Sequence, residues 1–463
     1  PAPTPPPRTH PPSPTPRRPP PTAPGAPYGD GAGAVWGPPP GKRGARLLER
    51  LVAQGGRGIR VRRLGAGRAG EIRLTRFLRN PAVTTGEMVE TAAAGVAARC
   101  AGRRVLAIQD TTVTRSEGGG GEYLHAVVVV DADDKALLGL AHACALERSS
   151  GRRAGRRERP VAEKESRRWL DGAQRAGAVC AAARQVIVVA DRESDIWEAF
   201  ARRPSGTELL VRAAHDRSLA DGGRLFAVVD ARPELGRASL DLPARGGRPA
   251  RTAVLSVRVA RVDLARPRGR PSSEGDQVGA VPVTLVDLRE VGGGGLHWRL
   301  LTTLPAIDLT QALEMAELYR CRWMIEQVFR TLKTAGFDIE NLRIADPAAR
   351  ARLVMAALVA AVIVQQLVHA REGGPSPLRP LTDAVDPDDQ PLLQALCRSL
   401  EGKTARQKNP HPPSSLAYAA WVCARLGGWT GYYGKPGPVV MLNGWLEFQA
   451  AKRAAILLAN QNV

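Results

Sequence analysis

The chain has 463 residues and carries 66 Lys and Arg against 45 Asp and Glu, a formal net charge of +21. A chain of this length can bury a large core and predicts two to four domains, and the positive charge suits a phosphate backbone. Only eight of the basic residues are Lys, so a GC-rich coding sequence could explain part of the Arg excess. The six Cys are scattered, with no C-x-x-C pair and no His at zinc spacing, which favours reduced, buried thiols in a cytosolic protein.

No segment predicts a membrane partner. The start of the chain has no secretory apolar region. The longest apolar segment, 353–368, is predicted to be a core helix, because Gln365 and Gln366 interrupt it and its uninterrupted part is too short to span a bilayer.

The first 97 residues fall into two parts. Residues 1–40 hold 17 Pro and few apolar side chains, which predicts a disordered or polyproline-like leader. This stretch has no initiator Met, and we interpret it as an upstream translation product or a fragment edge. Residues 41–97 predict short helices, at 44–54, at 71–80 and from a cap near Thr85 onward. Five Arg in this part make it a candidate DNA reader, although such Arg can equally form a solvated face: Arg62, Arg63, Arg73, Arg76 and Arg79.

Two short apolar runs in the next part each lead to an aspartate. Residues 105–109 (VLAIQ) precede Asp110, and residues 186–190 (VIVVA) precede Asp191. Such β-branched runs are typical of strands buried on both faces, and open α/β sheets place their sites at the exits of these strands. Taken alone, each aspartate could instead cap a helix or a turn.

The remaining elements follow in chain order. Residues 104–147 predict three strands, followed by a helix at 162–185, the strand before Asp191 and a short helix at 195–203. From about 207 to 303, alternating strands separated by Gly- and Arg-rich turns predict a β-rich insertion. A core helix is expected at 347–370, and a last helical unit at about 376–463, in which aromatic and apolar side chains predict packing on the core and on a second protomer.

A helix between the insertion and the core helix carries polar residues at regular spacing. Tyr319, Arg322, Glu326 and Lys333 fall within roughly 60° of one another on a helical wheel. A separate apolar stripe would pack on the core; it comprises Leu318, Cys321, Ile325, Val328 and Leu332. The polar face could be solvated, but three carboxylates from Asp110, Asp191 and Glu326 could also converge on hard divalent cations, which need oxygen ligands.

These motifs resemble a known family. The segments AIQDTT and VVADRESD and the series Y-x2-R-x3-E-x6-K are similar to the acidic signatures of bacterial DDE transposases with a Y-R-E-K motif, insertion sequence family four. The resemblance covers roughly residues 30–463. It implies an α/β fold: a ribonuclease-H-like core at 98–370, flanked by an N-terminal helical DNA-binding domain at 41–97 and a C-terminal helical dimerisation domain at 376–463. The predicted order β-β-β-α-β is what such a core needs, with the strands of Asp110 and Asp191 adjacent.

The resemblance also implies a function and roles for particular residues. Two Mg²⁺ or Mn²⁺ ions would bind the acidic triad and support cleavage and joining of DNA by a synaptic homodimer in the bacterial cytoplasm, at the nucleoid. The DNA would be the double-stranded terminal repeats of a transposon and a target. The residues expected to contact this DNA are Arg212, Trp298, Tyr319, Arg322, Arg330 and Lys333. Cleavage would pass through a hairpin, with Trp298 stacking a flipped base, although Trp298 could instead be a buried strand anchor.

Two other functions remain open from sequence. A metal-dependent nuclease of the same fold would cut DNA without joining it. An inactive, DNA-binding remnant of a transposase would do neither, although the intact acidic triad argues against decay.

Overall fold

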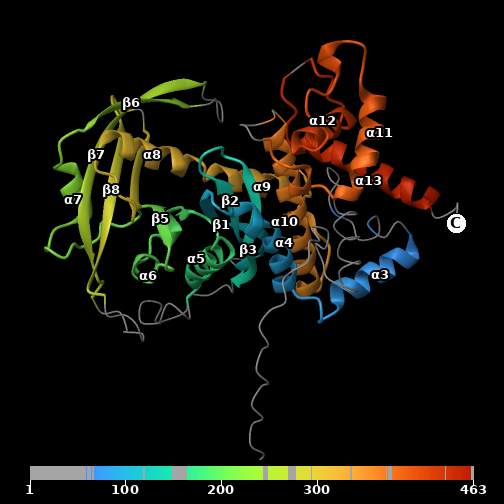
Figure 1. The fold of residues 1–463 in the computed structure, drawn as a ribbon. Helices are drawn as coiled ribbons and strands as arrows, with labels where there is room; N and C mark the ends of the chain where they lie inside the picture. Colours follow the sequence, from blue (N-terminus) through green and yellow to red (C-terminus); the bar gives the residue numbers. More distant parts are fainter. Residues whose placement is uncertain are drawn as a thin grey trace, which may run out of the picture. The chain divides into compact units, whose positions relative to one another are not determined.

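The computed structural model describes most of the chain from residue 67 onward (Figure 1). The described residues are 59, 64, 67–117, 120–148, 164–242, 249–268, 278–293, 295–333, 336–371, 373, 378–432 and 434–459. The Pro-rich leader at 1–40, the helix expected at 44–54 and the residues Arg62 and Arg63 lie outside this part. The chain divides into the units Pro1–Ala32 and Gly33–Val463, and everything below concerns the second.

Four strands match the core pattern predicted from sequence, and the fifth is the first strand of the region expected as an insertion. They are β1 (Arg104–Glu117), β2 (Gly120–Asp131), β3 (Leu137–Arg148), β4 (Gln185–Ala190) and β5 (Thr207–Arg212). Their order across the sheet is β3-β2-β1-β4-β5, with β1 parallel to β4 and β4 parallel to β5, while β2 is antiparallel to both β1 and β3. The adjacency expected for the first and fourth strands is therefore present.

Four more strands extend the same sheet. They are β6 (Gly236–Leu242), β7 (Arg251–Ala265), β8 (Ala280–Glu290) and β9 (His297–Thr302). Strand β9 joins them to the core by antiparallel pairing with β5, where Leu210 lies opposite Thr302. The result is one nine-stranded sheet, in which the region expected as a β-rich insertion continues the core sheet from β5 through β9, β8 and β7 to β6.

Helices surround the sheet and follow it in the chain. The helices are α3 (Arg68–Arg79), α4 (Thr85–Cys100), α5 (Arg167–Val179), α6 (Trp197–Ala201), α7 (Leu225–Asp230), α8 (Leu309–Arg320), α9 (Trp323–Leu332), α10 (Pro347–Ala370), α11 (Gln390–Leu400), α12 (Leu416–Leu426) and α13 (Pro438–Ala459). Short 3₁₀ turns are η2 (Arg192–Ser194), η3 (Ile339–Asn341), η4 (Leu381–Asp383), η5 (Pro387–Asp389) and η6 (Ala405–Gln407). The cap of α4 is Thr84, one residue before the predicted Thr85, because the hydroxyl of Thr84 accepts the N–H of Glu87.

The two faces of the sheet bury different sets of side chains. Successive residues of a strand point to opposite faces. Val105 and Ala107 of β1 accordingly belong to one apolar cluster with α5, α6 and α7, whereas Leu106 and Ile108 belong to another with α8, α9 and α10. Asp110 follows in the second series, so its side chain lies on the face that α9 covers.

Helix α10 is the one helix in the described part of the chain that is long and apolar enough to cross a membrane. In its most apolar stretch, 83% of the residues are buried inside the protein. The amide of Gln365 donates to the hydroxyl of Thr331 at 2.8 Å, and that of Gln366 donates to the carbonyl of Leu138 at 3.2 Å. These contacts confirm the prediction of a core helix, because both interrupting polar groups are satisfied within the fold.

Candidate functional site

Asp110 and Asp191 lie at the same level of two neighbouring parallel strands. Ile108 of β1 is opposite Val189 of β4, so two residues further along both strands are Asp110 and Asp191. Asp191 directly follows β4 and caps η2, accepting the N–H of Glu193 at 2.9 Å. The cap expected as an alternative for Asp191 is therefore present, and it coexists with this position beside Asp110.

The prediction that Asp110 ends its strand was wrong. Strand β1 continues to Glu117 because β2 pairs with it beyond this point, with Asp110 opposite Ala126. Strand β4 ends at Ala190, however, so Asp110 lies where β1 no longer has its parallel neighbour. This loss of a neighbour leaves room for side chains from outside the sheet.

The prediction of a single helix carrying Tyr319, Arg322, Glu326 and Lys333 was also wrong. Helix α8 ends at Arg320 and α9 begins at Trp323, while Lys333 is the residue after the end of α9. Between the two helices, the backbone N–H of Arg322 bonds to the carbonyl three residues back, at Tyr319, as in a 3₁₀ turn. The predicted apolar stripe is nevertheless buried, with Ile325, for example, fully inaccessible.

Arg322 joins two of the three carboxylates. Its Nη1 donates to Oδ2 of Asp110 at 2.9 Å, and its Nη2 forms an ion pair with Oε1 of Glu326. The side chains of Arg322 and Asp110 are only 20% and 17% exposed, and that of Glu326 is 35% exposed. The guanidinium thus links β1 to α9 at the point where β1 leaves β4.

The carboxyl group of Asp110 is electrostatically strained. Burial raises its pKa to about 6, although the Arg322 guanidinium acts in the opposite direction. The negative charges of Asp191 and Glu326 raise this pKa further, while the N–H of Thr111 lowers it by donating to Oδ1 at 2.7 Å. Asp110 is therefore close enough to Asp191 and to Glu326 to be repelled by both, and a bound cation would relieve such repulsion.

Arg212, Trp298 and Tyr319 lie beside this cluster. The phenol of Tyr319 interacts electrostatically with the guanidinium groups of both Arg212 and Arg322, and the Trp298 ring packs edge-on against the Tyr319 ring with centroids 5.7 Å apart. Arg212 also donates to the carbonyl of His297 at 3.0 Å. Burial lowers the pKa of Arg212, and the neighbouring charge of Arg192 lowers it further. A negatively charged group beside this guanidinium would therefore stabilise its charge.

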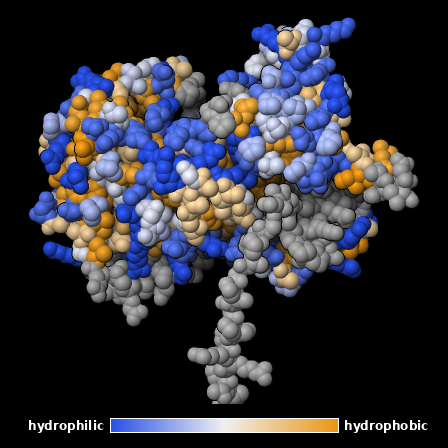
Figure 2. All heavy atoms as spheres, viewed as in Figure 1, coloured by the Kyte–Doolittle hydropathy of each residue, from blue (hydrophilic) through white to orange (hydrophobic). Residues whose placement is uncertain are grey.

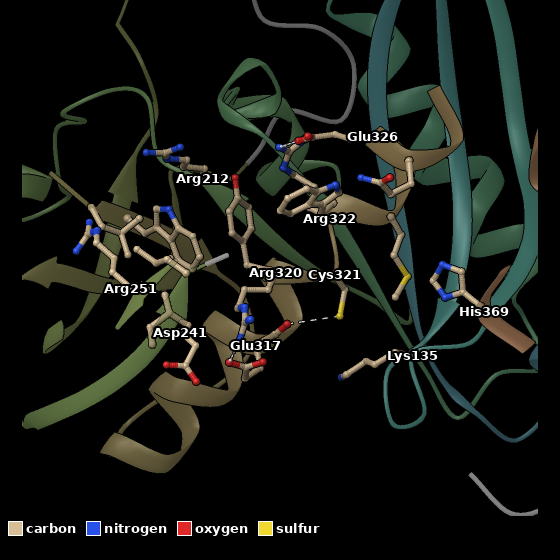
Figure 3. A pocket seen from close by; sticks show the side chains of 18 of the residues that line it. Lys135, Arg212, Asp241, Arg251, Glu317, Arg320, Cys321, Arg322, Glu326 and His369 are labelled. Carbon is tan, nitrogen blue, oxygen red and sulfur yellow. Dashed lines mark hydrogen bonds and ion pairs between the residues drawn. The ribbon is translucent and has the colours of Figure 1, made fainter. Parts of the chain in front are cut away.

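These residues border a cavity of about 940 Å³. Arg212, Trp298, Tyr319, Arg322 and Glu326 all line it, and Figure 3 shows Arg212, Arg322 and Glu326 grouped apart from Lys135 and His369. Trp298 is half-buried and packs partly against the main apolar cluster. Trp298 therefore takes part in the apolar packing and also borders the cavity.

A family model described as a transposase DDE domain matches residues 102–363, which is 262 of the 463 residues. The chain belongs to this family. The matched span begins just before β1, ends within α10 and includes Asp110, Asp191 and Glu326. The large mixed sheet with its helices is consistent with a ribonuclease-H-like DDE transposase domain.

Two of the expected DNA contacts of this transposase lie away from the cavity. Lys333 forms an ion pair with Glu340 at 2.9 Å, and Arg330 is exposed on α9. Neither is among the residues that line the cavity. The structure therefore brings together Asp110, Asp191 and Glu326 with Arg212, Trp298, Tyr319 and Arg322, but it places Arg330 and Lys333 elsewhere on or just after α9.

The donor set of the transposase fits a divalent cation by its chemistry. Asp110, and the two carboxylates of Asp191 and Glu326 that raise its pKa, supply the hard oxygen ligands that Mg²⁺ and Mn²⁺ prefer. Within the described part of the chain, no group of three or more His, Cys, Asp or Glu side chains is arranged closely enough to hold a metal ion as it stands. At this point the Arg322 guanidinium binds both Asp110 and Glu326.

Sequence reasoning missed part of the site's surroundings. The cavity is also lined by Trp323 and by three residues from distant parts of the chain, Lys135, Arg251 and His369. Trp323 follows Arg322 directly and is 41% exposed, so its place in the motif was the one local signal available. The others could not be found from sequence, because pairing of distant strands and packing of α10 bring them there.

Proposed function

We propose that the protein is a cut-and-paste DNA transposase of insertion sequence family four, with the Y-R-E-K motif formed by Tyr319, Arg322, Glu326 and Lys333. The observation that carries this proposal is the contact of Arg322 with Asp110 and Glu326, next to the strand that presents Asp191. Three acids, from β1, the end of β4 and α9, lie inside the span that matches the family. On this proposal these three carboxylates perform the chemistry.

Asp110, Asp191 and Glu326 would hold the metal, as two Mg²⁺ or Mn²⁺ ions. When bound, these ions supply the activation of a water or a 3′-hydroxyl and the neutralisation of charge at phosphorus, so that no protein nucleophile is needed. The chain's own contribution is to hold three carboxylates at one point despite their repulsion. Arg322 balances that repulsion in the free protein, and it is free to turn to a phosphate once the carboxylates are otherwise neutralised.

The cationic side chains beside the acids would position the scissile strand. Arg322 and Arg212 would hold phosphates through planar, forked donors, and Tyr319 would hydrogen-bond a phosphate between them. Support comes from the proximity of the three side chains and from the charge of Arg212, which lacks a carboxylate partner among the described contacts. Arg330 and Lys333 would contact DNA further along α9, with Lys333 leaving Glu340 to do so.

Trp298 would receive a base flipped from a DNA hairpin. Its position beside Tyr319 and on the wall of the cavity supports this role, because a stacked base needs open space next to the ring. Its partial packing in the sheet supports the other reading, that of a strand anchor.

The flanking helices would serve DNA binding and assembly. Arg73, Arg76 and Arg79 are exposed on α3, which suits an N-terminal DNA reader at 41–97. At the other end, apolar side chains gather near the C-terminus of α13, where Ile456 and Leu458 are 50% and 62% exposed (Figure 2). This patch supports a synaptic homodimer formed through residues 376–463. Such a protein would act in the bacterial cytoplasm, at the nucleoid.

One assay separates this proposal from its rivals. The purified chain is incubated with Mg²⁺, a duplex carrying the terminal repeats of its own element and a supercoiled target plasmid. A transposase cleaves at the repeat ends and joins them to the plasmid. Cleavage without joining would identify a nuclease, and binding without cleavage would identify an inactive remnant.

A further inference from the structure

Arg168 is a buried cation on the side of β1 opposite Arg322. It lies in the first turn of α5, and its side chain is only 6% exposed. A buried guanidinium is costly unless its donors are satisfied, so its partners indicate what the fold gains from it.

Each of the three guanidinium nitrogens of Arg168 donates a hydrogen bond. Nε donates to the hydroxyl of Thr111 at 3.0 Å, and Nη2 donates to Oε2 of Glu193 at 2.6 Å. Nη1 donates to the carbonyl of Glu165 at 2.9 Å within its own segment. One side chain of α5 therefore connects β1 to the turn that follows β4.

The two residues that Arg168 connects are the ones whose backbone N–H groups hold the catalytic aspartates. Thr111 donates its N–H to Oδ1 of Asp110 at 2.7 Å. Glu193 donates its N–H to Oδ1 of Asp191 at 2.9 Å. Thr111 and Glu193 therefore share one arrangement: the side chain of each binds Arg168, and the backbone N–H of each binds an aspartate carboxylate.

A neutral histidine completes the support on the β1 side. Nδ1 of His125 lies 3.0 Å from the hydroxyl of Thr111, opposite Thr111 in the β1–β2 register. Burial lowers the pKa of His125 to about 3, so the ring is uncharged at neutral pH. The Thr111 hydroxyl is thus fixed from two sides, and the only carboxylate that contacts the Arg168 guanidinium in the described contacts is that of Glu193.

We propose that Arg168 is a positioning residue for the metal site. It holds Thr111 and Glu193 at a fixed separation and, through their backbone N–H groups, sets the spacing of the Asp110 and Asp191 carboxylates. This inference rests on the proposed function, because it takes these two aspartates as metal ligands. Outer partners of ligating carboxylates orient them and tune the affinity of the site.

The test measures Mn²⁺ binding to the full chain, with its transposon-end duplex, from the electron paramagnetic resonance signal of free Mn²⁺. Variants are Arg168→Ala, Arg168→Lys and Glu193→Ala, with Arg167→Ala as the matched control. Arg167 is the neighbouring residue on α5, but its side chain is 55% exposed, and in the described part of the chain its ion pair is with the exposed Asp171 at 3.2 Å.

The Mn²⁺ dissociation constant is expected to rise about tenfold in Arg168→Ala and in Glu193→Ala, and to stay at the wild-type value in Arg167→Ala. Arg168→Lys should fall between them, because an ammonium cannot span both partners as a guanidinium does. The Mg²⁺ concentration for half-maximal cleavage should rise in parallel, and excess Mg²⁺ should restore cleavage, which a general loss of folding would not allow.

Wild-type Mn²⁺ affinity in Arg168→Ala would overturn the inference, whatever its melting temperature. If Arg168→Ala does not fold, Glu193→Ala decides, because the Glu193 side chain is 61% exposed and its removal opens no cavity in the core. The variant Asp110→Ala distinguishes a failure of this inference from a failure of the proposed metal site. Unchanged Mn²⁺ affinity in that variant would reject the proposed metal site itself, and with it the inference.

Discussion

Replacing Asp110 by Asn should stabilise the metal-free protein while removing its activity. Burial raises the pKa of this carboxyl from the ordinary 3.8 to about 6, so folding favours its protonated form. The folded state therefore binds this proton more tightly than the unfolded state does, and the free energy of unfolding falls as the pH rises from about 4 to about 6. The Asn amide resembles the protonated carboxyl and avoids this loss.

The structure sets the size of the effect. A pKa of about 6 in the folded chain against 3.8 corresponds to 2.2 × 1.36, or about 3 kcal/mol, in free energy of unfolding above pH 7. The side chain is only 17% exposed, so solvent screening removes little of this. The amide loses the ion pair with Arg322, but that attraction is already included in the pKa. We expect Asp110→Asn to be more stable than wild type by up to about 3 kcal/mol at pH 7.5, and equal to it near pH 4.

Urea unfolding in EDTA at pH 4, 5, 6 and 7.5, followed by circular dichroism, measures this difference. Asp195→Asn is the control with the opposite sign, because Asp195 is fully buried in an ion pair with Arg217 and the amide would weaken that pair. Adding Mg²⁺ should stabilise wild type but not Asp110→Asn. A destabilised Asp110→Asn at pH 7.5, or a difference that does not change with pH, would refute the reasoning.

Three further predictions concern DNA processing, assembly and packing. Trp298→Ala should nick transposon ends almost normally but accumulate nicked DNA, because the lost stacking of about 1–3 kcal/mol affects only the step that forms the hairpin. Equal loss of nicking and hairpin formation, with a lower melting temperature, would favour the role of Trp298 as a strand anchor. Truncation after residue 375 should abolish the paired-end complex in native gels, and a retained two-end complex would contradict assembly through the C-terminal helices. Arg350→Ala should lower the free energy of unfolding by about 3 kcal/mol, because it leaves Glu122 without its buried partner. Arg320→Ala removes one side of an exposed ion pair and should lower it by less than about 1 kcal/mol. Similar urea midpoints for the two variants would contradict this effect of burial.

The sequence predicted the elements whose signal is local. The apolar runs before Asp110 and Asp191 became β1 and β4, side by side, because fully buried strands show their burial in composition. The continuation of β1 past Asp110 was missed, because residues 111–115 (TTVTR) are mostly polar and their strand conformation depends on pairing with β2.

Features set by distant contacts could not be read in this way. No Gly or Pro marks the break between α8 and α9, so the sequence pattern predicted one continuous helix across Cys321 and Arg322. The end of α9 at Leu332 then separates Lys333 from the other motif residues and leaves it with Glu340. The union of the two halves of the sheet likewise depends on pairing of β5 with β9, some 90 residues apart, for which the sequence carries no local signal.

The most direct test of the central claim is DNA cleavage by the three single variants Asp110→Ala, Asp191→Ala and Glu326→Ala, each compared with wild type in Mg²⁺ on a duplex carrying the terminal repeats. Because the carboxylates act as one metal site, each variant is expected to lose cleavage while still binding the end in a gel-shift assay. Cleavage at a rate near that of wild type in any one of the three would contradict the assignment of that residue and of the shared site.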